Sequence, residues 1–117
     1  MTSMGGRTEL GEGLLAAARA EEEAMVSFLM ELVAMESPSD DPEAQRPVQA
    51  KLTEAYEELG FRVRRISGQT TGGMLLATPR KRVKGRPAQL LMGHCDTVWK
   101  VGTLETMPVV REGNRLR

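Results

Sequence analysis

The chain has little of several residue types, and each scarcity excludes a class of protein. A single cysteine among 117 residues excludes an internal disulfide framework and a cysteine-rich zinc module. Aromatic residues are limited to two phenylalanines, one tyrosine and one tryptophan, so eight methionines with leucine and valine must fill the core. Sixteen basic residues balance sixteen acidic ones, so no net charge favours nucleic acid or an anionic membrane surface.

The aromatic residues in full are Phe28, Tyr56, Phe61 and Trp99.

The sequence also has no long apolar run. No uninterrupted stretch approaches the roughly 20 residues of a membrane-spanning helix. The first twenty residues carry charges and lack the apolar segment of an export signal. We therefore expect a cytoplasmic protein with neither nucleic-acid nor membrane partners, which at this length is one domain or part of one.

Hydrophobic periodicity predicts an α/β fold that begins with helices. Residues 1–12 are polar and glycine-rich and predict a flexible N-terminus, which leaves residues 13–117 as the structured part. A helix is expected over residues 14–35, where apolar residues recur at helical spacing. It should end before Pro38, because proline disfavours helical geometry at the residue that precedes it.

A second helix is expected to carry the apolar stripe that runs from Val48 to Leu59, and to end at Gly60. Pro47 lies inside this stretch and cannot donate a helical hydrogen bond. The helix therefore either begins near Arg46 or is kinked in its first turns.

Short β-prone segments follow the second helix. We expect strands over residues 61–66, 74–78 and 88–93, and a hairpin over residues 109–117. Residues 88–93 are the most apolar of these segments, which is typical of a central strand that is covered on both faces.

His94 and Asp96 follow the apolar segment 88–93 directly and are the candidate functional residues. Alternate residues of a strand project from the same face, so these two side chains should emerge together, with Cα atoms about 6–7 Å apart. A metal-binding histidine commonly has its second ring nitrogen hydrogen-bonded to a carboxylate. We therefore interpret His94 as a metal ligand and Asp96 as its orienting neighbour; the alternative is a structural histidine followed by a turn.

The segment Gly93–Val98, with the sequence GHCDTV, resembles the G-H-x-D-T-V signature of the dinuclear zinc exopeptidases. This family includes glutamate carboxypeptidase, acetylornithine deacetylase and succinyl-diaminopimelate desuccinylase. Residues 32–39 (LVAMESPS) are similar to the end of that family's first helix, and residues 59–63 (LGFRV) to the junction of its second helix and first strand. Residues 107–116 look most like the glutamate carboxypeptidase branch. Together the similarities cover about residues 20–117.

The resemblance implies the N-terminal portion of a zinc-dependent catalytic domain, built on a mixed sheet with helices packed on it. It implies that His94 binds one of two zinc ions and that Asp96 is the catalytic carboxylate that holds the imidazole. The implied reaction is hydrolysis of a peptide or N-acyl amide bond next to a free carboxylate. This sequence does not contain the family's other metal ligands or its Glu-Glu pair, so we expect the chain alone to be inactive. The family's dimerisation domain is also not in this sequence, and the resemblance implies that the complete enzyme forms a homodimer.

Three other features have simpler interpretations. Glu57 and Glu58 are expected on a solvated helix face, well before the histidine, and do not match the family's Glu-Glu pair. Cys95 should point away from the two site residues and act as a small buried side chain. The basic run 80–86 has no interleaved aromatic residue, which favours a solvated loop over a nucleic-acid site. A small α/β module that binds a partner without chemistry remains the alternative to the hydrolase.

Overall fold

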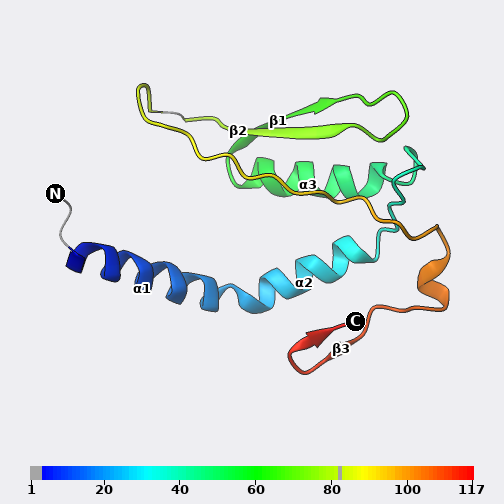
Figure 1. Ribbon diagram of the computed structural model, residues 1–117, viewed down its shortest axis with the longest axis horizontal. Helices are drawn as coiled ribbons and strands as arrows, with labels where there is room; N and C mark the ends of the chain where they lie inside the picture. Colours follow the sequence, from blue (N-terminus) through cyan, green and yellow to red (C-terminus); the bar gives the residue numbers. More distant parts are fainter. Residues whose placement is uncertain (1–3, 82) are drawn as a thin grey trace. The chain divides into compact units, whose positions relative to one another are not determined.

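The computed structural model describes residues 4–81 and 83–117, and the chain divides into two units, Met1–Glu31 and Leu32–Arg117. The described residues form three α-helices, one short 3₁₀ helix and two small antiparallel sheets (Figure 1). This mixture confirms the α/β class at its coarsest level. No helix of the described residues is both long and apolar enough to cross a membrane.

Two helices make up most of the first unit: α1 covers Met4–Ala20 and α2 covers Glu22–Val33, whose last two residues belong to the second unit. The sequence predicts a single helix from residue 14 onward. The helix instead begins ten residues earlier in the chain, within the segment predicted to be flexible, although each internal glycine costs about 1 kcal/mol of helix stability. A turn at Glu21 separates the two helices, and Pro38 lies beyond the end of α2 as expected.

Helix α3 covers Arg46–Glu58, which settles the question raised by Pro47. The proline lies in the first turn, where its missing N–H group would have no helical partner in any case. Gly60 follows the C-terminus with a φ of 82°, the left-handed conformation that glycine adopts most readily. The C-terminal end of this helix was therefore predicted correctly, and of the two alternatives left open for its beginning, the structure shows the start at Arg46.

Strand β1 (Phe61–Ile66) pairs antiparallel with β2 (Met74–Pro79), with Val63 opposite Ala77. Both strands agree with the prediction. Helix α3 packs against this hairpin (Figure 1), and alternate residues of the two strands are half-buried beneath it. Val48 of α3 is the one fully buried apolar side chain of the described residues, at 1% exposure.

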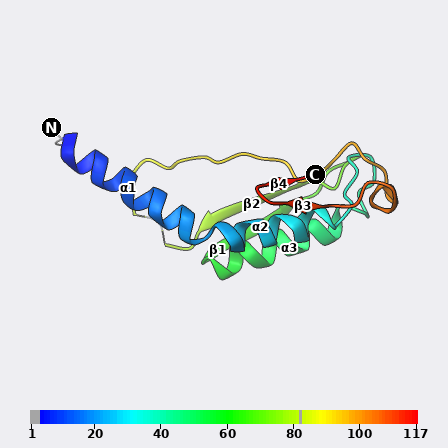
Figure 2. The same cartoon turned by 90° about the horizontal axis from the view of Figure 1, so that it is seen from below.

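The predicted strand over residues 88–93 is not formed, and this prediction was wrong for the described chain. The segment runs as an extended line without a strand partner (Figures 1 and 2). Leu90, Leu91 and Met92 are 77%, 91% and 87% exposed. The apolar pattern favours a covered strand, but a strand forms only where a neighbouring strand accepts its backbone hydrogen bonds, and none of the described residues does so here.

The C-terminal residues form a small hairpin, as predicted. Strand β3 (Arg111–Glu112) pairs antiparallel with β4 (Arg115–Leu116), and Gly113 occupies the turn with a φ of 59°. The 3₁₀ helix η1 (Thr103–Glu105) lies between the candidate site and this hairpin in the sequence.

Candidate functional site

The candidate site is built where two segments distant in sequence pair with each other. Pro38 and Thr97 form an isolated parallel β-bridge. The Thr97 amide donates to the carbonyl of Ser37 at 2.8 Å, and the Ser39 amide donates to the carbonyl of Thr97 at 2.9 Å. Because Pro38 disfavours helical geometry at Ser37, the chain leaves α2 in an extended form that is able to make this bridge.

Two serine side chains reinforce the bridge. Ser37 is 2% exposed, and its Oγ donates to the carbonyl of Cys95 at 2.7 Å. Ser39 Oγ lies 2.7 Å from Asp96 Oδ2 and 3.0 Å from the carbonyl oxygen of Thr97. These contacts fix the backbone on both sides of Asp96 and place a hydroxyl group against its carboxylate.

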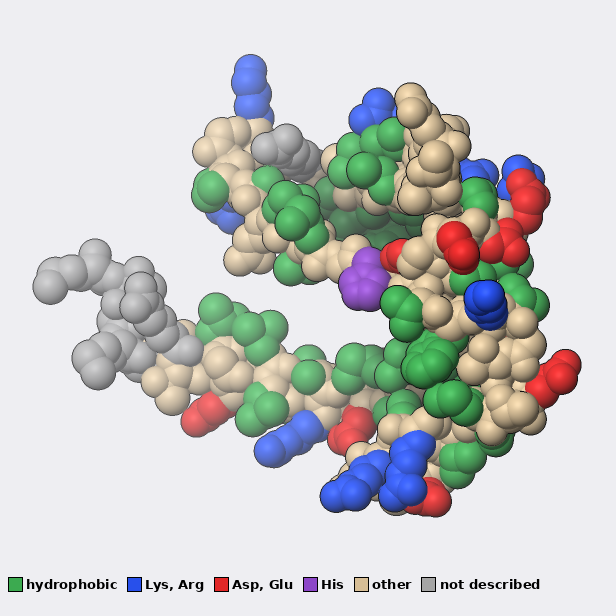
Figure 3. All heavy atoms as spheres, turned by 45° about the vertical axis from the view of Figure 1, so that its right-hand side comes forward, with side chains coloured by type: hydrophobic (Ala, Val, Ile, Leu, Met, Phe, Trp, Pro, Cys, Tyr) green, Lys and Arg blue, Asp and Glu red, His purple; other side chains and the backbone are tan. Residues whose placement is uncertain are grey.

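The His94 ring lies against Asp96 and is open to solvent. Its Nδ1 is 3.0 Å from the backbone carbonyl oxygen of Asp96 and 3.5 Å from the carboxylate Oδ1. The His94 side chain is 84% exposed (purple in Figure 3), whereas that of Asp96 is 39% exposed. A carbonyl oxygen only accepts, so this contact requires a proton on Nδ1, and the neutral ring then has its lone pair on Nε2.

The expected proximity of His94 and Asp96 is therefore present, although the closer partner of the ring is different. We expected the Asp96 carboxylate to hold the ring, but the backbone carbonyl of the same residue is 0.5 Å nearer to Nδ1 than the carboxylate oxygen. Either oxygen stabilises the same tautomer, in which Nε2 is available to a metal ion.

Glu36 fixes the loop that follows the site. Its Oε2 accepts from the Gly102 amide at 2.7 Å, and its Oε1 accepts from the Leu104 amide at 2.9 Å. These backbone N–H groups lie at the start of η1, and they hold the pKa of Glu36 below its ordinary value. Glu36, which directly precedes Ser37, thus anchors the loop that follows Thr97 in the sequence.

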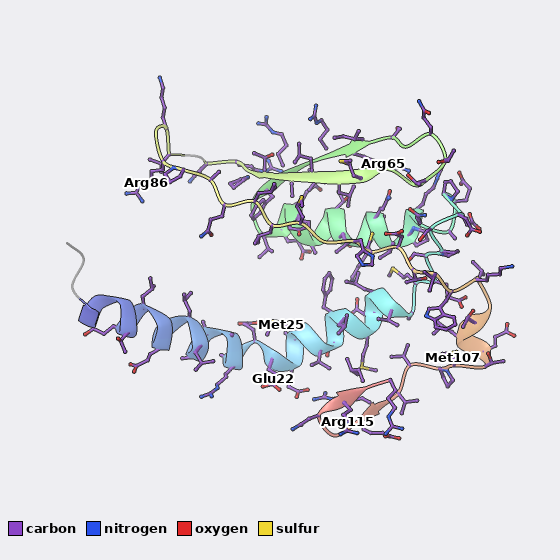
Figure 4. The ribbon with its side chains drawn as sticks, in the orientation of Figure 1. Glu22, Met25, Arg65, Arg86, Met107 and Arg115 are labelled. Atoms are coloured by element: carbon purple, nitrogen blue, oxygen red, sulfur yellow. The ribbon has the colours of Figure 1, made fainter. Side chains whose placement is uncertain are left out.

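Gln45 connects the site to α3 and the hairpin, and it is only 3% exposed. Its Nε2 donates to the carbonyls of Pro38 at 2.8 Å and Ser39 at 3.1 Å, while its Oε1 accepts from the Gly72 amide at 3.1 Å. A Cβ at position 72 would lie 2.3 Å from Gln45 Oε1, so this close approach requires glycine. Arg65 (labelled in Figure 4) donates to the Gly72 carbonyl at 3.3 Å.

The surroundings change the pKa values of Asp96 and Cys95 in opposite directions. The hydrogen bond from Ser39 is the main cause that lowers the pKa of Asp96, and His94 adds to it. Burial raises the pKa of the Cys95 thiol, and the charge of Asp96 raises it further. At neutral pH the site therefore carries an ionised carboxylate beside a protonated thiol, which makes Cys95 a poor metal ligand and nucleophile.

His94 and Asp96 fit part of a zinc site. An imidazole with a free Nε2 is a common zinc ligand, and an adjacent carboxylate is a common hydrogen-bond partner of the other ring nitrogen. A zinc site needs three or four protein donors, and residues 4–81 and 83–117 bring no three histidine, cysteine or acidic side chains together.

Comparison of the sequence with protein-family models and with curated proteins finds no match to this chain.

The remaining sequence candidates lie on exposed surface. Glu57 and Glu58 are exposed at the end of α3, as predicted, and Trp99 is 55% exposed. The described residues of the basic run 80–86 are exposed in the loop that contains Arg86 (Figure 4). Arg82, within that run, lies outside the described residues.

Sequence reasoning missed Ser37, Ser39 and Gln45 as parts of the site. The two serines flank Pro38 in a segment that was considered only as the end of a helix. Gln45 precedes α3 without a distinguishing pattern, and one of its hydrogen-bond partners lies 27 residues away.

Proposed function

We propose that this chain is the N-terminal portion of the catalytic domain of a zinc-dependent exopeptidase or deacylase. The complete enzyme would hydrolyse a peptide or N-acyl amide bond next to a free carboxylate. The observation that carries the proposal is the His94–Asp96 arrangement, in which Nδ1 is engaged by Asp96 while the His94 side chain is 84% exposed. It joins the resemblance of residues 93–98 to the metal-binding signature of that family.

In this proposal His94 binds zinc through Nε2, and Asp96 keeps the ring in the required tautomer. The negative charge of Asp96 also makes the imidazole a better donor to a cation. A zinc ion bound in such a site lowers the pKa of a water molecule and polarises the substrate carbonyl. One imidazole does not form a complete site, so we propose that the 117-residue chain is inactive by itself and that further ligands and the general base come from outside it.

The exposed segment 88–93 supports this interpretation. Its leucine and methionine side chains are almost fully exposed, and its backbone has the extended form of a strand without a strand partner among the described residues. We propose that these residues become a covered strand in the mixed sheet of the complete catalytic domain, with helices on its faces. A cytoplasmic location and a homodimeric assembly belong to the same proposal.

A non-catalytic α/β module is the second candidate. It is favoured by the way in which α3 and the β1–β2 hairpin pack together and share the buried Gln45–Gly72 contact within this chain. In that case the bridge between Pro38 and Thr97 would serve only to hold the two segments together, and His94 would be a solvent-exposed side chain without a ligand.

The proposal is tested by assaying the complete product of the gene for zinc-dependent hydrolysis of N-acyl amino acids and of dipeptides. We expect activity that is lost in His94→Ala and strongly reduced in Asp96→Asn, while Glu57→Gln on the exposed end of α3 leaves it unchanged. The 117-residue chain should show no turnover with or without zinc. Full activity of the His94→Ala protein, or no zinc-dependent hydrolysis by the complete product, would exclude the hydrolase.

A further inference from the structure

The Asp96 carboxylate has a closer polar neighbour than the imidazole. Ser39 Oγ lies 2.7 Å from Oδ2, whereas His94 Nδ1 lies 3.5 Å from Oδ1. The two neighbours contact different oxygens of the same carboxylate. The hydroxyl group thus bonds to Oδ2, and Oδ1 is the oxygen near the His94 ring.

Ser39 has one hydroxyl proton and two acceptors within reach, which are Asp96 Oδ2 at 2.7 Å and the Thr97 carbonyl at 3.0 Å. The carboxylate is the stronger acceptor because it is charged, and it is also the nearer of the two. The hydroxyl proton is therefore directed at Asp96, and the Thr97 carbonyl keeps the backbone N–H of Ser39 as its donor.

The backbone of Ser39 is held on both sides of the residue. Its amide donates to Thr97 at 2.9 Å, and its carbonyl accepts from the buried side chain of Gln45 at 3.1 Å. The position from which the hydroxyl reaches Asp96 is therefore fixed before any ligand binds. With the backbone held in this way, χ1 is the one torsion of Ser39 that the hydrogen bond to Asp96 must still fix.

We propose that Ser39 is a positioning residue of the site, whose hydroxyl group holds the Asp96 side chain in one rotamer with Oδ1 facing His94. Its consequence for metal binding rests on the function proposed above. Ser37 has a different task, because its hydroxyl group donates to the backbone carbonyl of Cys95. The pair Ser37 and Ser39 therefore offers a matched comparison within three residues.

The test measures the Asp96 χ1 rotamer populations of the 117-residue chain by NMR, from three-bond couplings to Cγ. We expect one dominant rotamer in the unaltered protein. Ser39→Ala should allow the three staggered wells to be shared, so that the dominant population falls by up to about threefold. Ser39→Thr, which retains the hydroxyl group, should restore the single rotamer.

Amide exchange at Thr97 separates positioning from a loss of structure. The bridge uses backbone groups, so its protection should persist in Ser39→Ala, whereas Ser37→Ala should weaken the bridge. An Asp96 side chain that is already averaged in the unaltered protein, or that stays fixed in Ser39→Ala, would overturn the proposal. Zinc titration of the same samples tests the metal site separately, since failure to bind zinc leaves the rotamer result unaffected.

Discussion

Replacement of Gln45 by alanine should destabilise both the fold and the candidate site. The side chain is 3% exposed and makes three hydrogen bonds, two from Nε2 and one to Oε1. At about 1 kcal/mol for each bond, the loss is about 3 kcal/mol, and more if the Gly72 amide stays buried without a partner. This is a large part of the roughly 5–15 kcal/mol by which a small domain is stable.

The assay is urea unfolding, followed by far-UV circular dichroism and by the fluorescence of Trp99, the single tryptophan. A slope of about 1–3 kcal/mol/M converts the loss into a fall of about 1–3 M in the midpoint. Gln69→Ala, in the exposed β1–β2 turn, is the control and should leave the midpoint unchanged.

A second variant separates the donor from the acceptor of the amide. Gln45→Glu keeps an oxygen for the Gly72 amide but places a carboxylate oxygen against the carbonyls of Pro38 and Ser39. We expect its destabilisation to decrease at acidic pH, where the carboxyl group regains a proton to donate. Equal midpoints for the unaltered protein and Gln45→Ala would refute the conclusion that this residue connects the hairpin to the site.

Three further perturbations have defined outcomes. Because the pKa of Glu36 is lowered in the folded chain, its ionised form stabilises the fold above the unfolded-state pKa, and this stability is lost as the pH falls through the folded-state pKa. Glu36→Gln should therefore make the free energy of unfolding, measured with denaturant, less dependent on pH in the acid range. The Cys95 thiol should react with a disulfide reagent more slowly in the folded chain than in urea, because its pKa is raised; equal rates would contradict this. Gly73→Ala should cost more stability than Gly85→Ala in thermal melts, since both have positive φ but only a Cβ at 73 meets backbone, the Ile66 carbonyl oxygen.

The elements that local signals encode were predictable from the sequence. Gly60 marks the C-terminal end of α3, Pro47 restricts where the helix can begin, and the alternation of Phe61 and Val63 with arginines identifies β1. Proline and glycine act through their own backbone geometry, so their effects do not depend on what lies elsewhere in the chain.

The contacts that complete the site were not predictable in this way. The two-residue spacing of His94 and Asp96 indicates that they lie close together, but it does not decide which oxygen faces the ring. That choice involves Ser39, which lies 57 residues earlier in the chain. The extended segment 88–93 shows the same limit, because an apolar pattern indicates a preference for burial without supplying a partner strand.

The proposed zinc site requires His94 to present Nε2 to the ion while Nδ1 keeps its proton and donates it to Asp96. The decisive experiment titrates the chain with zinc and follows both ring nitrogens of His94 by ¹⁵N NMR, in the unaltered protein and in Asp96→Asn, with Asp40→Asn as the control. We predict that zinc shifts the Nε2 resonance and that Nδ1 stays protonated. Asp96→Asn keeps the backbone carbonyl that faces Nδ1 but removes the negative charge beside the ring, so it should weaken the zinc response by about tenfold or more. A zinc response at Nδ1, or the same response in Asp96→Asn as in the unaltered protein, would exclude this role of His94 and Asp96.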